Sequence, residues 1–448
     1  MEVLISYFGV KERGSTVGRE VLGGMTTFAT MSYIIFVQPT VLSICGMDFG
    51  AVMMATCLSS ALATIAMGLY ARYPIALAPG MGQNFYLALT VCGTTAAGGL
   101  GYSWETALAA VFVAGALFLF LSFFGFRERV ITAIPDSLKS GIAAGIGLLI
   151  AFVGLQWSGL VVASPGTLVT LGNLKDGCVL LAMCGLVFTV TLMALRVRAA
   201  VLIGLLAVFV LGLLTKVLTY HGIVSAPPSL APTFGKLSFT KLVSGAEIVT
   251  AVFVFFFLDL FDTVGTLVGV GRQGGFMKDG RLPRARQAFA CDAMGTVAGA
   301  VLGTSTVTSY VESAAGITAG ARTGLASVVT GLLFVLAIFF APVARSIGEG
   351  VTVAGGAVVY PVVAPALIVV GCLMARNAKD VRWDDASEAI PSFLTMIMMP
   401  LAFSITDGIA FGAISFCLIK LLTGRGKQVN WLMYACAVAL LARYILLK

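Results

Sequence analysis

Charged residues are scarce in this chain: they make up 11% of its 448 residues, whereas hydrophobic residues make up 59%. About a quarter of the residues of a soluble domain are charged, so this composition excludes a surface that faces water on all sides. The mean hydropathy of +1.02 agrees. Apolar runs of about 20 residues recur along the whole length, as transmembrane helices require. The chain is therefore predicted to be an integral membrane protein with many spans.

Histidine is almost absent, since His221 is the single one. One histidine without ligand spacing around it cannot build a zinc site. The nine cysteines lie mostly in apolar stretches, which is typical of small buried side chains. We therefore expect no metal and no cofactor, apart from a proton as coupling ion, and an intramembrane enzyme is disfavoured.

The formal net charge of +8 raises the question of a nucleic-acid partner. The lysines and arginines, however, lie in short loops between apolar runs, where they orient a membrane protein instead. They are concentrated in the even-numbered connections if the N-terminus is cytoplasmic. This bias predicts a multi-pass protein of the cell membrane with a cytoplasmic connection at 271–287 and an external stretch at 221–244, and no nucleic acid as a partner.

Fourteen apolar segments fall into two sets of seven, separated by a polar connector. The first set is expected near 20–44, 49–70, 76–95, 104–124, 138–160, 178–195 and 199–219. The second is expected near 248–270, 288–303, 305–319, 323–345, 353–375, 389–405 and 407–423. An odd number of spans inverts the second copy. The domains predicted are a first repeat at 1–219, an external connector at 220–247, a second repeat at 248–423 and a C-terminal apolar segment at 424–448, whose stretch 430–447 could span or lie in the interface.

The third and tenth spans are both interrupted. Pro79, Gly80 and Gly82 in Ala78-Pro-Gly-Met-Gly-Gln-Asn-Phe-Tyr86 break the third, and the polar, β-prone run Gly303-Thr-Ser-Thr-Val-Thr-Ser-Tyr-Val-Glu-Ser313 breaks the tenth. Paired broken spans at matching places in two repeats indicate a binding site near the bilayer midplane. The fold class predicted is an all-α polytopic membrane protein of about fourteen spans, arranged as a 7+7 inverted repeat with β-like breaks in spans 3 and 10.

Three carboxylates lie inside apolar spans. Asp259 and Asp262 share a face of the eighth span, and Glu312 lies inside the interrupted tenth span. An ionised carboxylate in a bilayer is costly unless it is paired, hydrated or protonated. Asp259 and Glu312 are the candidates for carrying a proton, and all three are candidates for binding substrate. The structural alternative is that they brace neighbouring helices.

The amides Gln83 and Asn84 lie at the break of the third span. An amide both donates and accepts hydrogen bonds, which suits the edge of a heterocycle; the alternative is that it satisfies backbone groups freed by the break. Neighbouring aromatic residues could stack on a flat ligand, although packing is the commoner role: Phe85, Tyr86, Phe261 and Tyr310. The small residues Gly316, Gly320 and Gly324 indicate close helix packing.

The segments Thr26-Thr-Phe-Ala-Thr-Met-Ser-Tyr33, Ala78 to Asn84, Leu258-Asp-Leu-Phe-Asp-Thr-Val-Gly-Thr266 and Thr308-Ser-Tyr-Val-Glu-Ser313 resemble the AzgA-like purine permeases. These belong to the nucleobase–cation symporter superfamily, which includes xanthine and uracil permeases. The resemblance implies a core domain of spans one to four and eight to eleven, and a gate domain of the rest. It implies that Asp259 contacts the base, with Glu312 and Asn84 beside it.

This resemblance predicts a transporter that imports hypoxanthine, guanine or adenine by proton symport, with an elevator-like alternating-access mechanism and a lipid surround. Two alternatives remain open. One is an anion exchanger or channel on the same scaffold, although acids in the site would repel an anion; the other is a uracil or xanthine permease. The preferred purine, sodium in place of the proton, and a homodimeric state are also left open.

Overall fold

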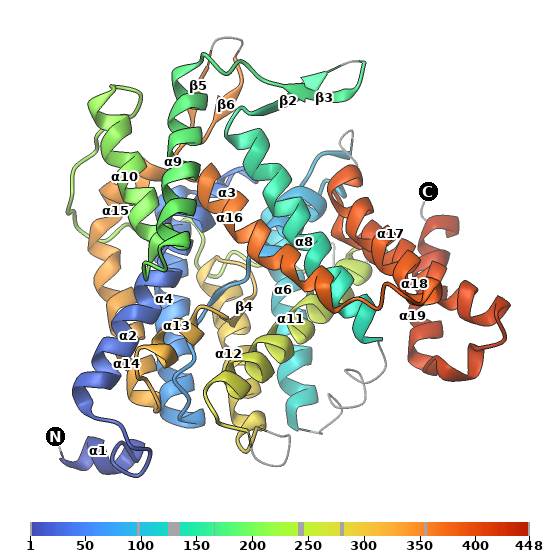
Figure 1. Ribbon diagram of the computed structural model, residues 1–448, viewed down its shortest axis with the longest axis horizontal. Coiled ribbons are helices and arrows are strands. Elements are labelled where there is room, and N and C mark those ends of the chain that lie inside the picture. Colours follow the sequence, from blue (N-terminus) through green and yellow to red (C-terminus); the bar gives the residue numbers. More distant parts are fainter. Residues whose placement is uncertain are drawn as a thin grey trace.

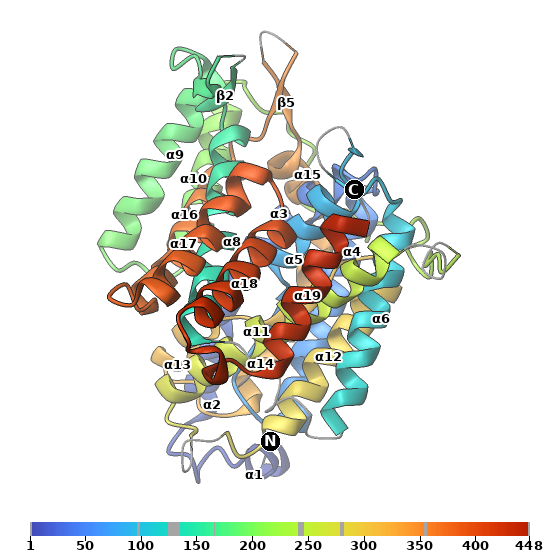
Figure 2. The same cartoon turned by 90° about the vertical axis from the view of Figure 1, so that its right-hand side faces the viewer.

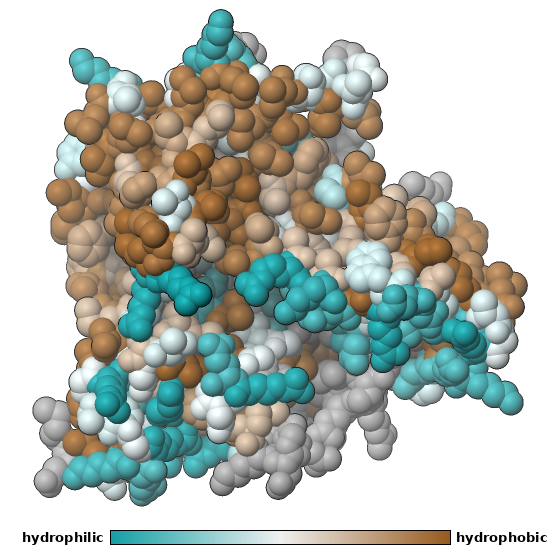
Figure 3. All heavy atoms as spheres, in the orientation of Figure 1, coloured by the Kyte–Doolittle hydropathy of each residue, from teal (hydrophilic) through white to brown (hydrophobic). Residues whose placement is uncertain are grey.

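The computed structural model describes residues 2–95, 99–123, 135–164, 166–240, 246–277, 282–353 and 356–446, and it is mostly helical (Figure 1). In these ranges eight helical segments are long and apolar enough to cross a membrane, and three shorter apolar helices accompany them. One face of the molecule carries a broad hydrophobic band, with hydrophilic residues gathered toward the end near α1 (Glu2–Phe8) (Figure 3). This pattern matches a protein surrounded by lipid.

The first half holds the elements of spans one to seven. They are α2 (Val17–Met31), α3 (Ile34–Ser43), α4 (Phe49–Ala66) with a π-helical turn (Met67–Ala71), β1 (Leu77–Pro79), α5 (Met81–Phe85) with a π-helical turn (Tyr86–Val91), α6 (Trp104–Phe123), α8 (Asp136–Trp157), β2 (Val161–Ser164), β3 (Leu168–Leu171), α9 (Gly177–Ala194) and α10 (Ala200–Leu214).

The second half repeats this plan after a connector. Its elements are α11 (Ala246–Gln273), α12 (Ala285–Leu302), β4 (Val307–Ser309), α13 (Ser313–Thr318), α14 (Gly324–Ala337) with a 3₁₀ turn (Ile338–Phe340), α15 (Ala341–Gly348), β5 (Val351–Thr352), β6 (Val358–Val359), α16 (Ala364–Ala375) with a 3₁₀ turn (Arg376–Asp380), α17 (Ala386–Ala402), α18 (Ile405–Leu422), a 3₁₀ turn (Gly426–Gln428) and α19 (Trp431–Leu446).

Each half replaces its third span by a short strand followed by a short helix, as predicted. The two strands, β1 and β4, pair antiparallel, with Leu77 opposite Ser309 and Pro79 opposite Val307. Pro79 lacks an N–H, and a two-stranded ribbon tolerates it because each strand has a free edge. The pairing joins two segments that lie far apart in the sequence, and because the strands are antiparallel, α5 and α13 follow opposite ends of the pair. The 7+7 arrangement with two broken spans is confirmed.

The helices pack in two groups. In one, α2, α4, α6, α11, α12 and α14 contact one another around the β1–β4 pair. In the other, α8 lies along α16 and α17, α17 along α18, and α9 along α10 and α16. Few elements cross between the groups, chiefly α5 against α8 and α10 against α2. These groups are the core and the gate that the resemblance implied.

Close backbone contact inside the core depends on small residues. A Cβ added to Gly324 would lie 2.0 Å from the carbonyl oxygen of Gly68, and one added to Gly316 would lie 2.0 Å from Oγ1 of Thr27. Any side chain there would force α14 away from α4 and α13 away from α2. The prediction of close packing at Gly316 and Gly324 is confirmed.

The C-terminal apolar segment folds as α19, which lies beside α18 (Figure 2). The hydroxyl of Tyr444, near the end of α19, donates to Asp407 at the start of α18. The thiol of Cys417, farther along α18, bonds to the carbonyl of Met433 near the start of α19 at 3.7 Å. The two helices are therefore antiparallel along much of their length.

Candidate functional site

The break of the third span presents two buried amides. Gly80 begins the turn into α5, and its N–H donates to the carbonyl of Thr306 at 2.9 Å, which ties α5 to the tenth span. Asn84 is fully buried, and its side-chain oxygen accepts from the hydroxyl of Ser305. Its side-chain nitrogen has no hydrogen-bond partner in the described part of the chain. Asn84 therefore retains a donor for a ligand.

Gln83 is equally buried, at 1% exposure. Its side-chain nitrogen lies 3.5 Å from Oδ2 of Asp262, at the limit of a hydrogen bond, and its side-chain oxygen has no partner within the described residues. A Cβ on Gly80 would lie 2.2 Å from that oxygen, so glycine at position 80 makes room for Gln83. Gln83 thus retains an acceptor beside the donor of Asn84.

The two aspartates of α11 have different surroundings. Asp262 is half-buried and faces Gln83. Asp259 is buried, and its Oδ2 accepts from Oγ1 of Thr296 on α12 at 3.3 Å. Oγ1 of Thr296 also lies 2.9 Å from the carbonyl oxygen of Val307, so the single hydroxyl proton is shared between that carbonyl and Asp259. The structure therefore places Asp262 beside the side-chain amide of Gln83, whereas Asp259 faces α12 close to Val307, the first residue of β4.

Glu312 lies in the turn between β4 and α13. The hydroxyl of Tyr33, at the break between α2 and α3, donates to its Oε1 at 2.8 Å. Glu312 thus contacts the first span, whereas Asp262 contacts Gln83 of the third. Within the described ranges neither forms an ion pair with a lysine or arginine. The site therefore has spare acceptors without a built-in cation.

Two residues of this region were not singled out from the sequence. Tyr33 stands in the first quoted motif, and its signal is a hydroxyl next to the break of span one. Asp292 on α12 is fully buried and accepts from Oγ1 of Thr263 at 2.8 Å and Oγ of Ser309 at 3.2 Å. The cost of burying a carboxylate, which identified Asp259, applies equally to Asp292. It ties α11 and β4 to α12 behind the site.

Three of the four aromatic residues considered for stacking have packing contacts. Phe85 is fully buried with its ring centroid 6.2 Å from that of Trp157, and Tyr86 lies 4.9 Å from Phe255. The hydroxyl of Tyr310 donates a hydrogen bond to the carbonyl of Pro79, the last residue of β1. The side chain of Phe261 lies outside the described residues.

Chemically, the arrangement is a polar, cation-free patch between two half-helices. It offers an amide donor, an amide acceptor and two carboxylates, which together match a neutral molecule with N–H groups, carbonyls or ring nitrogens on its edges. No group of three or more histidine, cysteine, aspartate or glutamate side chains within the described ranges is arranged to hold a metal ion.

Comparison with known proteins agrees with this picture. Residues 18–411 match the family model described as Permease family, that of the xanthine and uracil permeases. The chain is 46% identical over 455 residues to the guanine/hypoxanthine permease PbuG of Bacillus subtilis, covering 99% of this chain and 100% of that protein. It is 41% identical over 428 residues to the adenine permease AdeP of Escherichia coli, covering 94% and 92%. The transmembrane domain of the cyanobacterial bicarbonate transporter BicA shares the fold, with a TM-score of 0.63, 14% identity, and coverage of 88% of this chain and 97% of that one.

Proposed function

Because the chain belongs to the Permease family of xanthine and uracil permeases, within its AzgA-like purine branch, we propose that it imports purine nucleobases by proton symport. The observation that supports this proposal is the pair of buried amides at the break of the third span, Gln83 beside Asp262 and Asn84 beside Ser305, each of which has an unpartnered side-chain atom among the described residues. Relatives named for guanine, hypoxanthine and adenine transport support the purine as the substrate class.

Recognition of the base would use the spare hydrogen-bonding atoms. The side-chain nitrogen of Asn84 would donate to a carbonyl or ring nitrogen, and the side-chain oxygen of Gln83 would accept an N–H. Glu312 and an aspartate of α11 would accept the remaining ring N–H groups. Such a site favours a base over a saturated solute, because a purine edge alternates donors and acceptors.

Proton coupling would depend on the carboxylates. Moving a site with a bare carboxylate through the closed state is costly, since the bilayer centre disfavours charge. A proton taken up with the base removes that charge, and its release inside resets the carrier. Glu312 is the proposed carrier, with Asp259 as the other candidate from the sequence; the Tyr33 hydroxyl would hold Glu312 in place in either state.

Alternating access would move the core against the gate. The site is built entirely on core elements, so it would travel with them as one body. The sparse contacts between the groups, chiefly α5 against α8, suit an elevator-like displacement. The N-terminus would lie in the cytoplasm, as the arginine bias predicts.

The direct test is uptake of radiolabelled hypoxanthine by the purified chain in proteoliposomes. We expect accumulation with an inward proton gradient, loss of accumulation with a protonophore, and competition by guanine or adenine but not by uracil. A sodium gradient at equal pH separates sodium coupling from proton coupling. Absence of purine uptake under all gradients would refute the proposal.

The alternative of an anion exchanger is examined with the same vesicles. Its support is the fold shared with the bicarbonate transporter, and at 14% identity that similarity concerns the fold alone. Chloride- or bicarbonate-dependent exchange without purine uptake would favour it over the purine carrier.

A further inference from the structure

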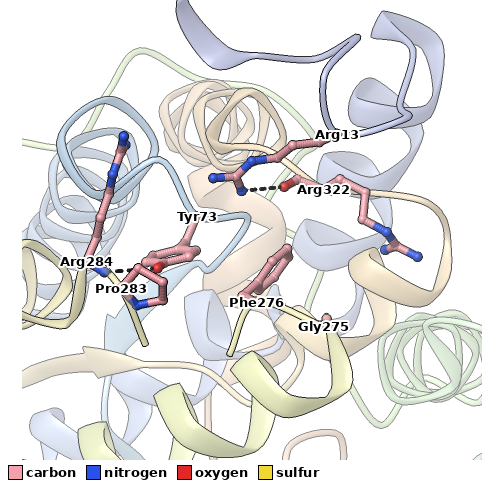
Figure 4. A pocket seen from close by; sticks show the side chains of 8 residues that line it. Arg13, Tyr73, Gly275, Phe276, Pro283, Arg284 and Arg322 are labelled. Atoms are coloured by element: carbon pink, nitrogen blue, oxygen red, sulfur yellow. Dashed lines mark hydrogen bonds between the residues drawn. The ribbon is translucent and has the colours of Figure 1, made fainter. Parts of the chain in front are cut away.

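A cavity of about 580 Å³ lies at the end of the core where the N-terminal segment, the β1 lead-in, the α11–α12 connection and the α13–α14 connection meet (Figure 4). Its wall includes Arg13, Arg284 and Arg322 together with the rings of Tyr73 and Phe276. Among the residues that the structure describes, no acidic side chain lines it. All of these segments are attached to core helices, so the cavity is separate from the boundary between core and gate.

The three arginines differ in what they already bind. Arg322 is engaged, because its Nη1 donates to the carbonyls of Ile317 at 2.6 Å and Ala321 at 2.7 Å. Nη1 of Arg13 donates to the carbonyl of Arg322 at 2.9 Å, and the other N–H groups of this guanidinium remain available to a ligand. The guanidinium of Arg284 has no hydrogen-bond acceptor or carboxylate within the described residues.

The rings of Tyr73 and Phe276 line the cavity together with these arginines. Tyr73 and Phe276 have ring centroids 5.6 Å apart, and the guanidinium of Arg13 lies 5.9 Å from the ring of Phe276. The Tyr73 hydroxyl accepts the N–H of Arg284 at 3.2 Å and keeps its own proton to donate. A ligand placed above the rings would thus meet hydrogen-bond donors from Arg13, Tyr73 and Arg284.

We propose that this cavity binds a phosphate monoester group. Donors that approach from separate sides suit a phosphate, which has three terminal oxygens, better than a flat carboxylate, which one arginine fork saturates. The rings of Tyr73 and Phe276, tilted by 47° to each other, offer two apolar faces against which a base attached to the phosphate can pack. The volume falls in the range of small-molecule sites. A soluble purine nucleotide fits both features; an anionic lipid headgroup shares the phosphate chemistry.

The test measures GMP binding to the full-length protein in nanodiscs of neutral lipid, with excess hypoxanthine present to occupy any transport site. We expect saturable GMP binding, no binding of guanosine, and an affinity about tenfold lower in Arg13→Gln and in Arg284→Gln. Arg284→Lys retains the charge and should keep part of the affinity. Arg272→Gln is the matched control, because Arg272 is exposed at the same end but does not line the cavity.

A second arm separates the two sources of phosphate. If GMP does not bind but phosphatidic acid in the nanodisc raises the unfolding temperature of the wild type and not of Arg13→Gln or Arg284→Gln, the phosphate site is a lipid site. If neither GMP nor phosphatidic acid acts, or if the arginine variants bind as the wild type does, the inference is wrong. Because these readouts do not use transport, they stay decisive whatever the carrier moves.

Discussion

At the scale of single residues, the site is a set of hydrogen-bonding groups whose partners are only partly supplied by the protein. Glu312 has the hydroxyl of Tyr33, Asn84 has Ser305 on one side only, and Gln83 has a long contact with Asp262. An unpaired buried polar atom costs free energy. A ligand that satisfies these atoms recovers that cost, which is a physical reason to expect binding here.

Glu312→Gln tests the coupling role. The amide keeps the shape of a protonated carboxyl group but cannot release a proton. We expect the variant to keep purine binding and exchange within about tenfold of the wild type and to lose accumulation in response to a proton gradient. Binding to purified protein and uptake into proteoliposomes measure the two effects. Normal gradient-driven accumulation would show that Glu312 is not the obligatory carrier and would favour Asp259.

Asp259 and Asp262 allow a direct comparison of motif and geometry. The family resemblance predicts that Asp259→Asn is the more damaging change, whereas the structure places Asp262 beside Gln83 and Asp259 beside Thr296. From the geometry we expect Asp262→Asn to weaken purine binding about tenfold, the loss of one charge-assisted hydrogen bond, and Asp259→Asn to weaken it less. Calorimetric titration of both purified variants decides. The opposite order would place the base on the α12 side of α11.

At the scale of elements, the β1–β4 pair determines where the half-helices begin. Gly80, which begins the turn into α5, has no room for a Cβ. Gly80→Ala would place a methyl group 2.2 Å from Oε1 of Gln83 and 2.8 Å from Cγ2 of Thr308. We expect purine uptake to fall at least about tenfold while the protein still reaches the membrane, because a displaced amide loses its bond to the base. Gly265→Ala is the control, since a Cβ there meets nothing within 4 Å; equal uptake in both variants would contradict the prediction.

A buried ion pair joins the helices of the gate. Glu388 on α17 lies 3.5 Å from Nζ of Lys420 on α18 and accepts from Ser137 on α8 at 2.6 Å, with both charged residues buried. Removing Glu388 leaves the buried Lys420 with only the longer contact to Asp385 at 3.8 Å, so the cost stays below the ~3–5 kcal/mol of a fully unpaired buried charge. Glu388→Gln should therefore lower the unfolding temperature in detergent by several degrees. Asp136→Asn, which breaks an exposed pair with Lys139, should change it little; similar shifts in both would contradict a buried pair.

At the scale of the whole molecule, the crossing number determines which segments share a side of the membrane. Fourteen spans return the chain to its starting side, and we predict that α19, which is antiparallel to α18, crosses once more. Two positions that test this topology lie outside the described residues: Lys278, between α11 and α12, and Lys448, the last residue.

We predict that Lys278→Cys is labelled from the cytoplasm, and that Ser229→Cys and Lys448→Cys are labelled from outside. The physical reason is the arginine bias for the first two and the crossing by α19 for the third. The measurement is labelling of intact cells with an impermeant thiol reagent in a background without the nine native cysteines. Labelling of position 278 from outside would overturn the topology; protection of position 448 alone would mean that α19 does not cross.

The sequence by itself determined the features that depend on the cost of placing groups in lipid. That cost is local, because it depends on each segment and not on how the helices pack. It requires long apolar spans, so that Pro79 and Gly80 stand out as a break. It also makes Asp259, Asp262 and Glu312 candidate site residues whatever their neighbours in the fold. The same reasoning would have found Asp292 had it been applied to the ninth span. The correspondence between the broken third span and the broken tenth span was also predictable from the sequence. Each repeat has seven spans, and an odd number of spans inverts the second copy.

Only the tertiary structure decided which group each candidate faces. Asp259 and Asp262 share a helix face in the sequence pattern, but one turns to Thr296 and the other to Gln83, because a difference of one turn selects a different neighbouring helix. Tyr33 meets Glu312 across 279 residues, and the strand pair joins Leu77 to Ser309. Contacts of that kind depend on how helices pack against each other, and packing is set by the shapes of both surfaces at once rather than by the pattern along either one.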